Sequence, residues 1–144
     1  MDISNIKPTE RSVEIEHPGT GAYIGLRIHV MSIDDERLKP IKRSITDERF
    51  KLESKGKSLK TEDVERNGER LLFKATTGWE WYNPTGKEGD DGYDAEAMPN
   101  FNGSIPDHNQ RNFVDLIRAV PWIGDQLREE IDETKAFFGN SKGN

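Results

Sequence analysis

The sequence predicts an α+β fold, with an N-terminal antiparallel β-hairpin followed by about four short helices and more helix than strand. Apolar and polar residues alternate on both sides of a Pro/Gly turn within the first 31 residues, which is the pattern of a half-buried hairpin. From residue 32 onward the apolar residues recur at intervals of three and four instead, as in amphipathic helices. The 144 residues suit one domain of ordinary size.

The sequence pattern divides the chain into one domain and a short segment at each end. We expect a flexible N-terminus over residues 1–11, a single domain over residues 12–138 and a flexible tail over residues 139–144. The domain has four expected parts in order: the β-hairpin 12–31, a helical middle 32–78, a long acidic and glycine-rich loop 83–105, and a C-terminal helical pair 107–138.

The hairpin prediction depends on two alternating segments. Val13 and Ile15 alternate with polar neighbours before the turn at residues 17–21, and the alternation resumes from Ile24 to Val30. In the second segment, Gly25, Arg27 and His29 occupy the opposite face. The sequence therefore predicts a sheet with one buried face and one face in water.

The helical middle contains two predicted helices. The first begins near Pro40, a residue that is favourable at the start of a helix and unfavourable inside one. The second begins near Thr61 and carries one apolar stripe through Val64, Leu71, Leu72 and Ala75. We expect this second helix to run to Gly78, because glycine commonly terminates helices.

The last third of the chain is predicted to be a loop and two helices. The segment 83–105 is rich in glycine, proline and aspartate, and is a candidate mobile segment. Asp107 followed by Gln110 fits a capping box at the start of a helix. Pro121 interrupts the helical pattern and can begin the final helix.

Composition argues against several classes of function. The net charge is −6 with a sequence pI near 5.2, so the surface repels phosphate and we expect no nucleic-acid partner. No apolar run approaches the roughly 20 residues of a membrane span, so we expect no membrane partner. The chain has no cysteine, which excludes disulfides, thiolate nucleophiles and cysteine-ligated zinc.

The residues that could carry chemistry have simpler structural explanations. His17 adjoins a turn proline, His29 lies on the polar side of a strand, and His108 lies near a helix start. The carboxylates of residues 90–96 lack the spacing of a calcium-binding loop. We therefore predict a protein that is not an enzyme and uses no cofactor or metal. The alternative is a hydrolase or a metal-dependent enzyme built on His29, His108 and that acidic loop.

Aromatic residues are the strongest candidates for partner binding, because they bury much area at low entropic cost. The six candidates are Trp79, Trp81, Tyr82, Trp122, Phe137 and Phe138. A small core also needs some of them. We expect Trp79 and Trp122 in the core, and Trp81, Tyr82 and one terminal phenylalanine at a partner surface.

Four short motifs follow one another in the second half of the chain: Gly78-Trp79, the segment from Asn112 to Ile117, Pro121-Trp122-Ile123, and Phe137-Phe138. This order resembles the tail assembly chaperones of long-tailed, non-contractile bacteriophages. The resemblance covers most of residues 12–138 and is best in the second half. The chain departs from the family in the connection 83–105, which is longer and richer in glycine.

The resemblance implies a protein that binds the phage tape measure protein, keeps that long apolar helical chain soluble and promotes tail-tube assembly around it. It implies a location in the host cell cytoplasm, without retention in the mature virion. The major tail tube protein and a frameshifted longer form of this chain are further implied partners. The alternative is a small structural virion component, such as a tail-completion or head-tail connector protein.

A holdase needs apolar grooves framed by charge rather than catalytic groups. We expect the client's apolar stripe to lie between the two C-terminal helices and the region of Trp79 and Trp81. A hairpin is marginally stable alone and leaves an exposed edge. We therefore also expect a homo-oligomer.

Overall fold

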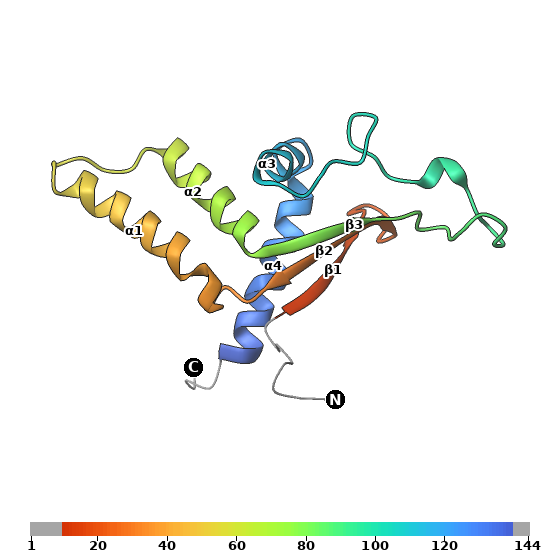
Figure 1. Ribbon diagram of the computed structural model, residues 1–144, viewed down its shortest axis with the longest axis horizontal. Helices are drawn as coiled ribbons and strands as arrows, with labels where there is room; N and C mark the ends of the chain where they lie inside the picture. Colours follow the sequence, from red (N-terminus) through yellow and green to blue (C-terminus); the bar gives the residue numbers. More distant parts are fainter. Residues whose placement is uncertain (1–9, 140–144) are drawn as a thin grey trace.

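The structure is a computed structural model that describes residues 10–139, with side chains as far as Ile131. It confirms the α+β class: within the described residues, a three-stranded antiparallel sheet packs against helices (Figure 1). The strands are β1 (Glu10–Glu16), β2 (Tyr23–Met31) and β3 (Thr76–Trp81). The helices are α1 (Lys39–Glu53), α2 (Thr61–Lys74), α3 (Gln110–Ala119) and α4 (Pro121–Gly139), with 3-10 turns at Glu36–Leu38 and Ala95–Ala97.

The predicted hairpin is confirmed as β1 and β2. Val13 lies opposite Ile28, and a bulge between Glu14 and Glu16 brings Glu16 opposite Tyr23. Leu26 and Ile28 are fully buried, so the apolar face of β2 points into the core as the alternation predicts.

The second helix is shorter than predicted. In the structure α2 ends at Lys74 rather than at Gly78, and the next residues form β3. This strand pairs antiparallel with β2, with Trp79 opposite Ile28. Threonine and tryptophan favour strands, whereas the apolar stripe through Ala75 continues the helical period up to the boundary. The change from helix to strand is therefore not visible in the spacing of the apolar residues.

The core lies between the inner face of the sheet and the helices that cover it. Phe113 of α3 and Leu127 of α4 are fully buried in the same core as the apolar residues of β2. Figure 1 shows α4 crossing behind the sheet, and Gln126 binds the backbone of Glu16 through bonds of 2.9 and 2.7 Å. The edge of β1 is therefore tied to α4 at that point.

The C-terminal helical pair is confirmed, with its break at Val120 and Pro121. Its first helix starts later than the capping-box pattern predicts. Asn109 is the N-cap, and its side chain accepts a 2.9 Å bond from the backbone N–H of Asn112. Asn109 has the extended backbone that a cap requires.

The long segment 83–105 extends beyond the end of the sheet, on the side away from α1 and α2 (Figure 1). Hydrogen bonds cross the segment: the Asn83 side chain donates to the carbonyl of Asp94 at 2.7 Å, and the Asp94 N–H donates to the Thr85 hydroxyl at 2.9 Å. The loop assignment is confirmed, but the segment contains internal hydrogen bonds and one 3-10 turn.

This segment begins with a close backbone approach at Gly25. The Tyr82 N–H donates to the Gly25 carbonyl at 2.8 Å. A Cβ on Gly25 would lie 2.0 Å from the Tyr82 carbonyl oxygen and 2.9 Å from Pro84, and the residue has a φ of +91°. Only glycine fits that position.

Gly25→Ala is expected to lower the free energy of unfolding by at least about 2 kcal/mol more than Gly89→Ala. Gly89 is the matched control because its φ of +98° is similar and nothing lies within 4 Å of its Cβ position. Denaturant unfolding of both variants measures the difference. Equal losses would mean that conformation alone, and not the contact with Tyr82, requires glycine at position 25.

Candidate functional site

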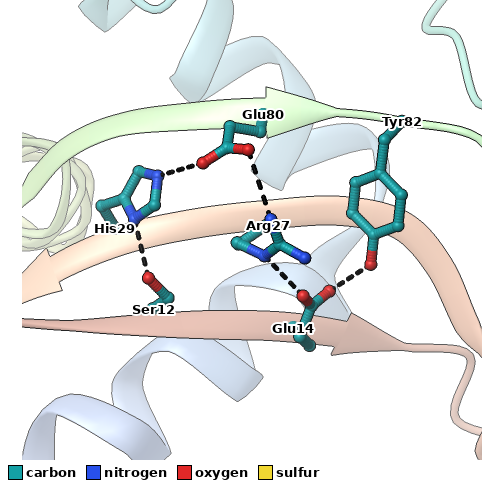
Figure 2. Close-up of polar contacts among 6 residues, drawn as sticks. All are labelled: Ser12, Glu14, Arg27, His29, Glu80 and Tyr82. Atoms are coloured by element: carbon teal, nitrogen blue, oxygen red, sulfur yellow. Dashed lines mark hydrogen bonds and ion pairs between the residues drawn. The ribbon is translucent and has the colours of Figure 1, made fainter.

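The outer face of the sheet carries a hydrogen-bonded row of six polar side chains from all three strands and from Tyr82 beyond β3 (Figure 2). Arg27 is central: its Nε contacts Glu14 at 2.5 Å and its Nη1 contacts Glu80 at 3.2 Å. Each strand therefore contributes to one cross-strand network. Pairs of opposite charge across neighbouring strands stabilise the register of a sheet.

His29 continues the row between Ser12 and Glu80. Its Nε2 lies 2.8 Å from a Glu80 oxygen, and its Nδ1 lies 2.8 Å from the Ser12 hydroxyl. Since a carboxylate only accepts, Nε2 carries the proton, and in the neutral ring Ser12 donates to Nδ1. This order of serine, histidine and carboxylate has the connectivity of a hydrolase triad.

The environment of this row favours a structural role. The side chains of His29 and Glu80 are 35% and 52% exposed, so water reaches the groups that a hydrolase would shield. Glu80 also forms an ion pair with Arg27. The adjacent depression, lined by residues that include Ser12, His29 and Thr77, is shallow and polar. We therefore interpret the row as a cross-strand polar ladder.

Tyr82 closes the ladder at the base of the long segment. Its hydroxyl donates a short hydrogen bond to Glu14, and the Arg27 guanidinium lies 4.9 Å from its ring centroid. Burial and the hydrogen bond to Glu14 raise the pKa of Tyr82 to about 12. Tyr82, a predicted partner-binding residue, thus already has partners within its own sheet.

Trp79 and Trp81 lie on the inner side of β3, half-buried against the core. The Trp79 indole N–H donates to the Pro106 carbonyl at 3.1 Å, and its ring stacks on Phe113. Trp81 meets Trp79 edge to face at 5.6 Å, and its buried indole nitrogen has no hydrogen-bond partner among the described residues. Both tryptophans contribute to the inner layer.

His108 joins this aromatic layer from the loop before α3. It packs beside Phe73 and edge to face with Trp79. The Thr76 hydroxyl donates to the Phe73 carbonyl at 2.6 Å and lies 2.8 Å from His108 Nε2. Because that hydroxyl has a single proton, it accepts from Nε2–H. Burial lowers the pKa of His108, which favours the neutral ring.

The remaining predicted aromatic residues lie at the C-terminal helices. Trp122 is half-buried in the first turn of α4 and lies 6.0 Å from the His17 ring. The side chains of Phe137 and Phe138 lie outside the described residues. The structure therefore brings Trp79 and Trp81 together, and Trp122 lies with a different neighbour.

The client groove expected between the two C-terminal helices is occupied by the chain itself. Phe113, Leu116 and Ile117 of α3 are buried in the same core as Ile123 and Leu127 of α4. An apolar depression of about 240 Å³ lies instead between α2 and α4. We call it the α2–α4 groove; its lining residues are Ile33, Gly68, Leu71, Leu72, Ala75, Arg128 and Ile131.

The α2–α4 groove is open because of Gly68. Nothing lies within 4 Å of a Cβ built on this helical glycine. Val64, one turn earlier on the same stripe of α2, is 55% exposed. Arg128 lies at the rim, with a 3.4 Å contact to Asp125. The result is a short apolar trough with a cation at its edge.

The histidines and acidic residues of the alternative enzyme hypothesis lie apart. His29 is on the outer face of the sheet, whereas His108 packs in the inner aromatic layer. Within the described residues, no three His, Cys, Asp or Glu side chains are arranged to hold a metal ion. None of the described helices is both long and apolar enough to cross a membrane.

Comparisons with protein-family models, curated proteins and solved structures found no match to this chain.

Sequence reasoning missed the α2–α4 groove and the polar ladder. The signals were present in part: the stripe through Val64, Leu71 and Ala75 marks the groove face of α2, and Gly68 interrupts it. Arg27 and His29 mark the outer sheet face. Their partner Glu80 was hidden because β3 was assigned in part to a helix.

The stability of the protein is expected to fall as the pH decreases below about 6.5, the ordinary histidine value, and His108 contributes to that fall. The pKa of His108 is lower in the folded chain, so the unfolded chain binds the extra proton first. His108→Gln retains a donor for Thr76 but does not titrate. Melting temperatures from pH 7.5 to 5 should decrease more in the wild type than in this variant. Parallel curves would contradict the prediction.

Tyr82 is expected to ionise near pH 12 rather than near its ordinary pKa of 10. Spectrophotometric titration of the folded protein should show a late tyrosinate phase that Tyr82→Phe removes. Tyr23→Phe is the control, since Tyr23 is exposed and lies outside the ladder, and it should leave the late phase unchanged. A late phase that persists in Tyr82→Phe would contradict the assignment.

Proposed function

We propose that this chain is a tail assembly chaperone of a long-tailed, non-contractile phage, and that it binds the tape measure protein and keeps it soluble. In this role it acts in the host cell cytoplasm, promotes tail-tube assembly around its client and is left out of the mature virion. The major tail tube protein and a frameshifted longer form of the chain are its further proposed partners.

The α2–α4 groove is the observation that carries the proposal. It is apolar, it opens on the surface, and Gly68 leaves space where another side chain would fill it. An amphipathic helix binds in such a groove through apolar residues spaced three and four apart. Burying one large aliphatic side chain there contributes about 1.5–3 kcal/mol.

The charge of the whole chain suits a holdase. When the chain covers the apolar stripe of a client helix, the resulting complex must itself stay soluble. One third of the chain is charged, and its net charge is −6. Arg128 at the rim can pair with a carboxylate of the client, which would set the direction in which the client helix lies.

The motifs behind the resemblance occupy positions that build this scaffold. Gly78 and Trp79 lie in β3, the segment from Asn112 to Ile117 lies in α3, and Pro121 begins α4. These elements form the core that orients α2 and α4, and this supports the proposal. The proposed function requires no covalent reaction, because a holdase acts by binding alone.

Gly68→Leu tests the groove directly. Leucine is the better helix former by roughly 0.8–1 kcal/mol and has space at this position, so the variant should melt at or above the wild-type temperature. Its side chain should nevertheless fill the groove and reduce client capture. Co-expression with a helix-rich phage tape measure protein, followed by measurement of soluble client that co-purifies, gives the readout. Glu65→Leu, at an exposed position of α2, is the matched control and should capture client normally.

Two outcomes would overturn the proposal. If the client precipitates equally with and without the wild-type chain, the chain is not its holdase. If proteomics finds the chain in purified particles at a fixed copy number, it is a structural virion component instead. Equal client capture by Gly68→Leu and wild type would reject the α2–α4 groove as the binding site.

A further inference from the structure

A second depression, of about 410 Å³, lies between α2 and α3, and half of the residues that line it are arginines. Arg66 and Arg70 come from α2, and Arg111 and Arg118 come from α3. Two carboxylates, Glu69 and Asp115, also line it. We call this depression the arginine groove. Its positive charge contrasts with the net charge of −6 of the whole chain.

Within the described range, carboxylates of the same chain form ion pairs with only two of these four arginines. Arg118 makes a bidentate pair with Glu69 at 2.7 Å, and Arg66 contacts Glu48 and Asp63 at 3.1 Å each. Among the described residues, Arg70 and Arg111 have no carboxylate partner. The only hydrogen bond of the Arg70 side chain there goes to Asn67 at 3.1 Å. Two guanidinium groups are therefore available for an anionic partner.

The opposite charge is concentrated on the long segment. Residues 86–97, which we call the acidic arm, carry five exposed carboxylates: Glu88, Asp90, Asp91, Asp94 and Glu96. None of them pairs with a cation in the described part of the chain. Asp90 and Asp94 accept backbone hydrogen bonds that shape the arm. Glu88 and Asp91 accept none there, so their charges face water.

The arm and the arginine groove of one chain lie apart. Figure 1 shows the arm beyond the end of the sheet, on the side away from α2. No ion pair joins the two surfaces within the described residues. Their charges complement each other, so a second copy of the chain can supply what each surface lacks.

We propose that the acidic arm of one copy docks in the arginine groove of the next. This contact joins two different surfaces, so it is head-to-tail and produces a ring if the rotation closes or an open chain if it does not. Arg70 and Arg111 receive the carboxylates of the arm. The proposal concerns this chain alone, so its failure would leave the client proposal standing.

A second copy fits the groove better than a nucleic acid does. Glu69 and Asp115 lie among the arginines, where they would repel a continuous phosphate backbone. The acidic arm of a second copy carries separate carboxylates. It can therefore bind the arginines without placing a negative charge beside Glu69 or Asp115. Several ion pairs formed together across one interface also steer its assembly.

Charge reversal on each surface tests the proposal with the full-length chain. The groove variant is Arg70→Glu with Arg111→Glu, and the arm variant is Glu88→Lys with Asp91→Lys. Sedimentation velocity over a range of protein concentrations at low salt gives the association constant. Each variant alone should associate about tenfold or more weakly than wild type. Salt near 1 M, where the Debye length is about 3 Å, should also weaken wild-type association.

Mixing the two variants provides the decisive step. The acidic arm of the groove variant meets an intact arginine groove, and the lysine arm of the arm variant meets a glutamate groove. The mixture should therefore regain wild-type association. Arg111→Glu alone, which breaks no hydrogen bond among the described residues, guards against misfolding, and its melting temperature should match wild type. Arg43→Glu, an equal charge change on exposed α1, should associate normally.

Several results would overturn the proposal. These are a monomeric wild type at all concentrations, equal association of all variants, or a mixture that stays monomeric. A short DNA duplex serves as the probe for the other class of partner. If a monomeric wild type binds the duplex and Arg111→Glu does not, the groove is a phosphate site and the proposal of a second copy is wrong.

Discussion

The buried face of β2 is the constraint on which the rest of the structure depends. Leu26, Ile28 and Val30 are almost fully buried, and a chain with so few aliphatic residues has little else with which to build a core. β1 and β3 pair with the two edges of β2, and residues of α2, α3 and α4 join its apolar face in one core. The hydrophobic stabilisation gained by this burial scales with the apolar area removed from water.

The outer face of the same strand is organised by charge instead of by burial. Arg27 and His29 lie between carboxylates from β1 and β3. At a face in contact with water, such pairs contribute modest stability, but their cross-strand arrangement opposes a register shift. A shift by one residue would place Arg27 in the core and Ile28 in water. The ladder and the core therefore favour the same register.

α2 connects the core to both proposed binding surfaces. Leu72 faces the core, Gly68 opens the apolar groove beside α4, and Arg66 and Arg70 face α3. These faces follow from the helical period of 3.6 residues, which distributes neighbouring residues around the axis. Leu72 lies both in the core and along the apolar groove, one turn after Gly68, whereas the two arginines lie on another side of the helix. One helix can therefore serve the client groove and the arginine groove at once.

The sequence by itself determined the hairpin, the four helices, the break at Pro121 and the wet face of the sheet, because these depend on local period and on residues with restricted backbones. It could not place the boundary near Ala75, since an apolar stripe of helical period runs into a strand whose partner is distant in the chain. Only the tertiary structure paired β3 with β2 and so revealed the partners of Trp79 and Tyr82. It alone also brought Arg70 near Arg111 and left the space at Gly68. Those features arise from how separate elements pack, and packing is decided by contacts between residues far apart in the chain.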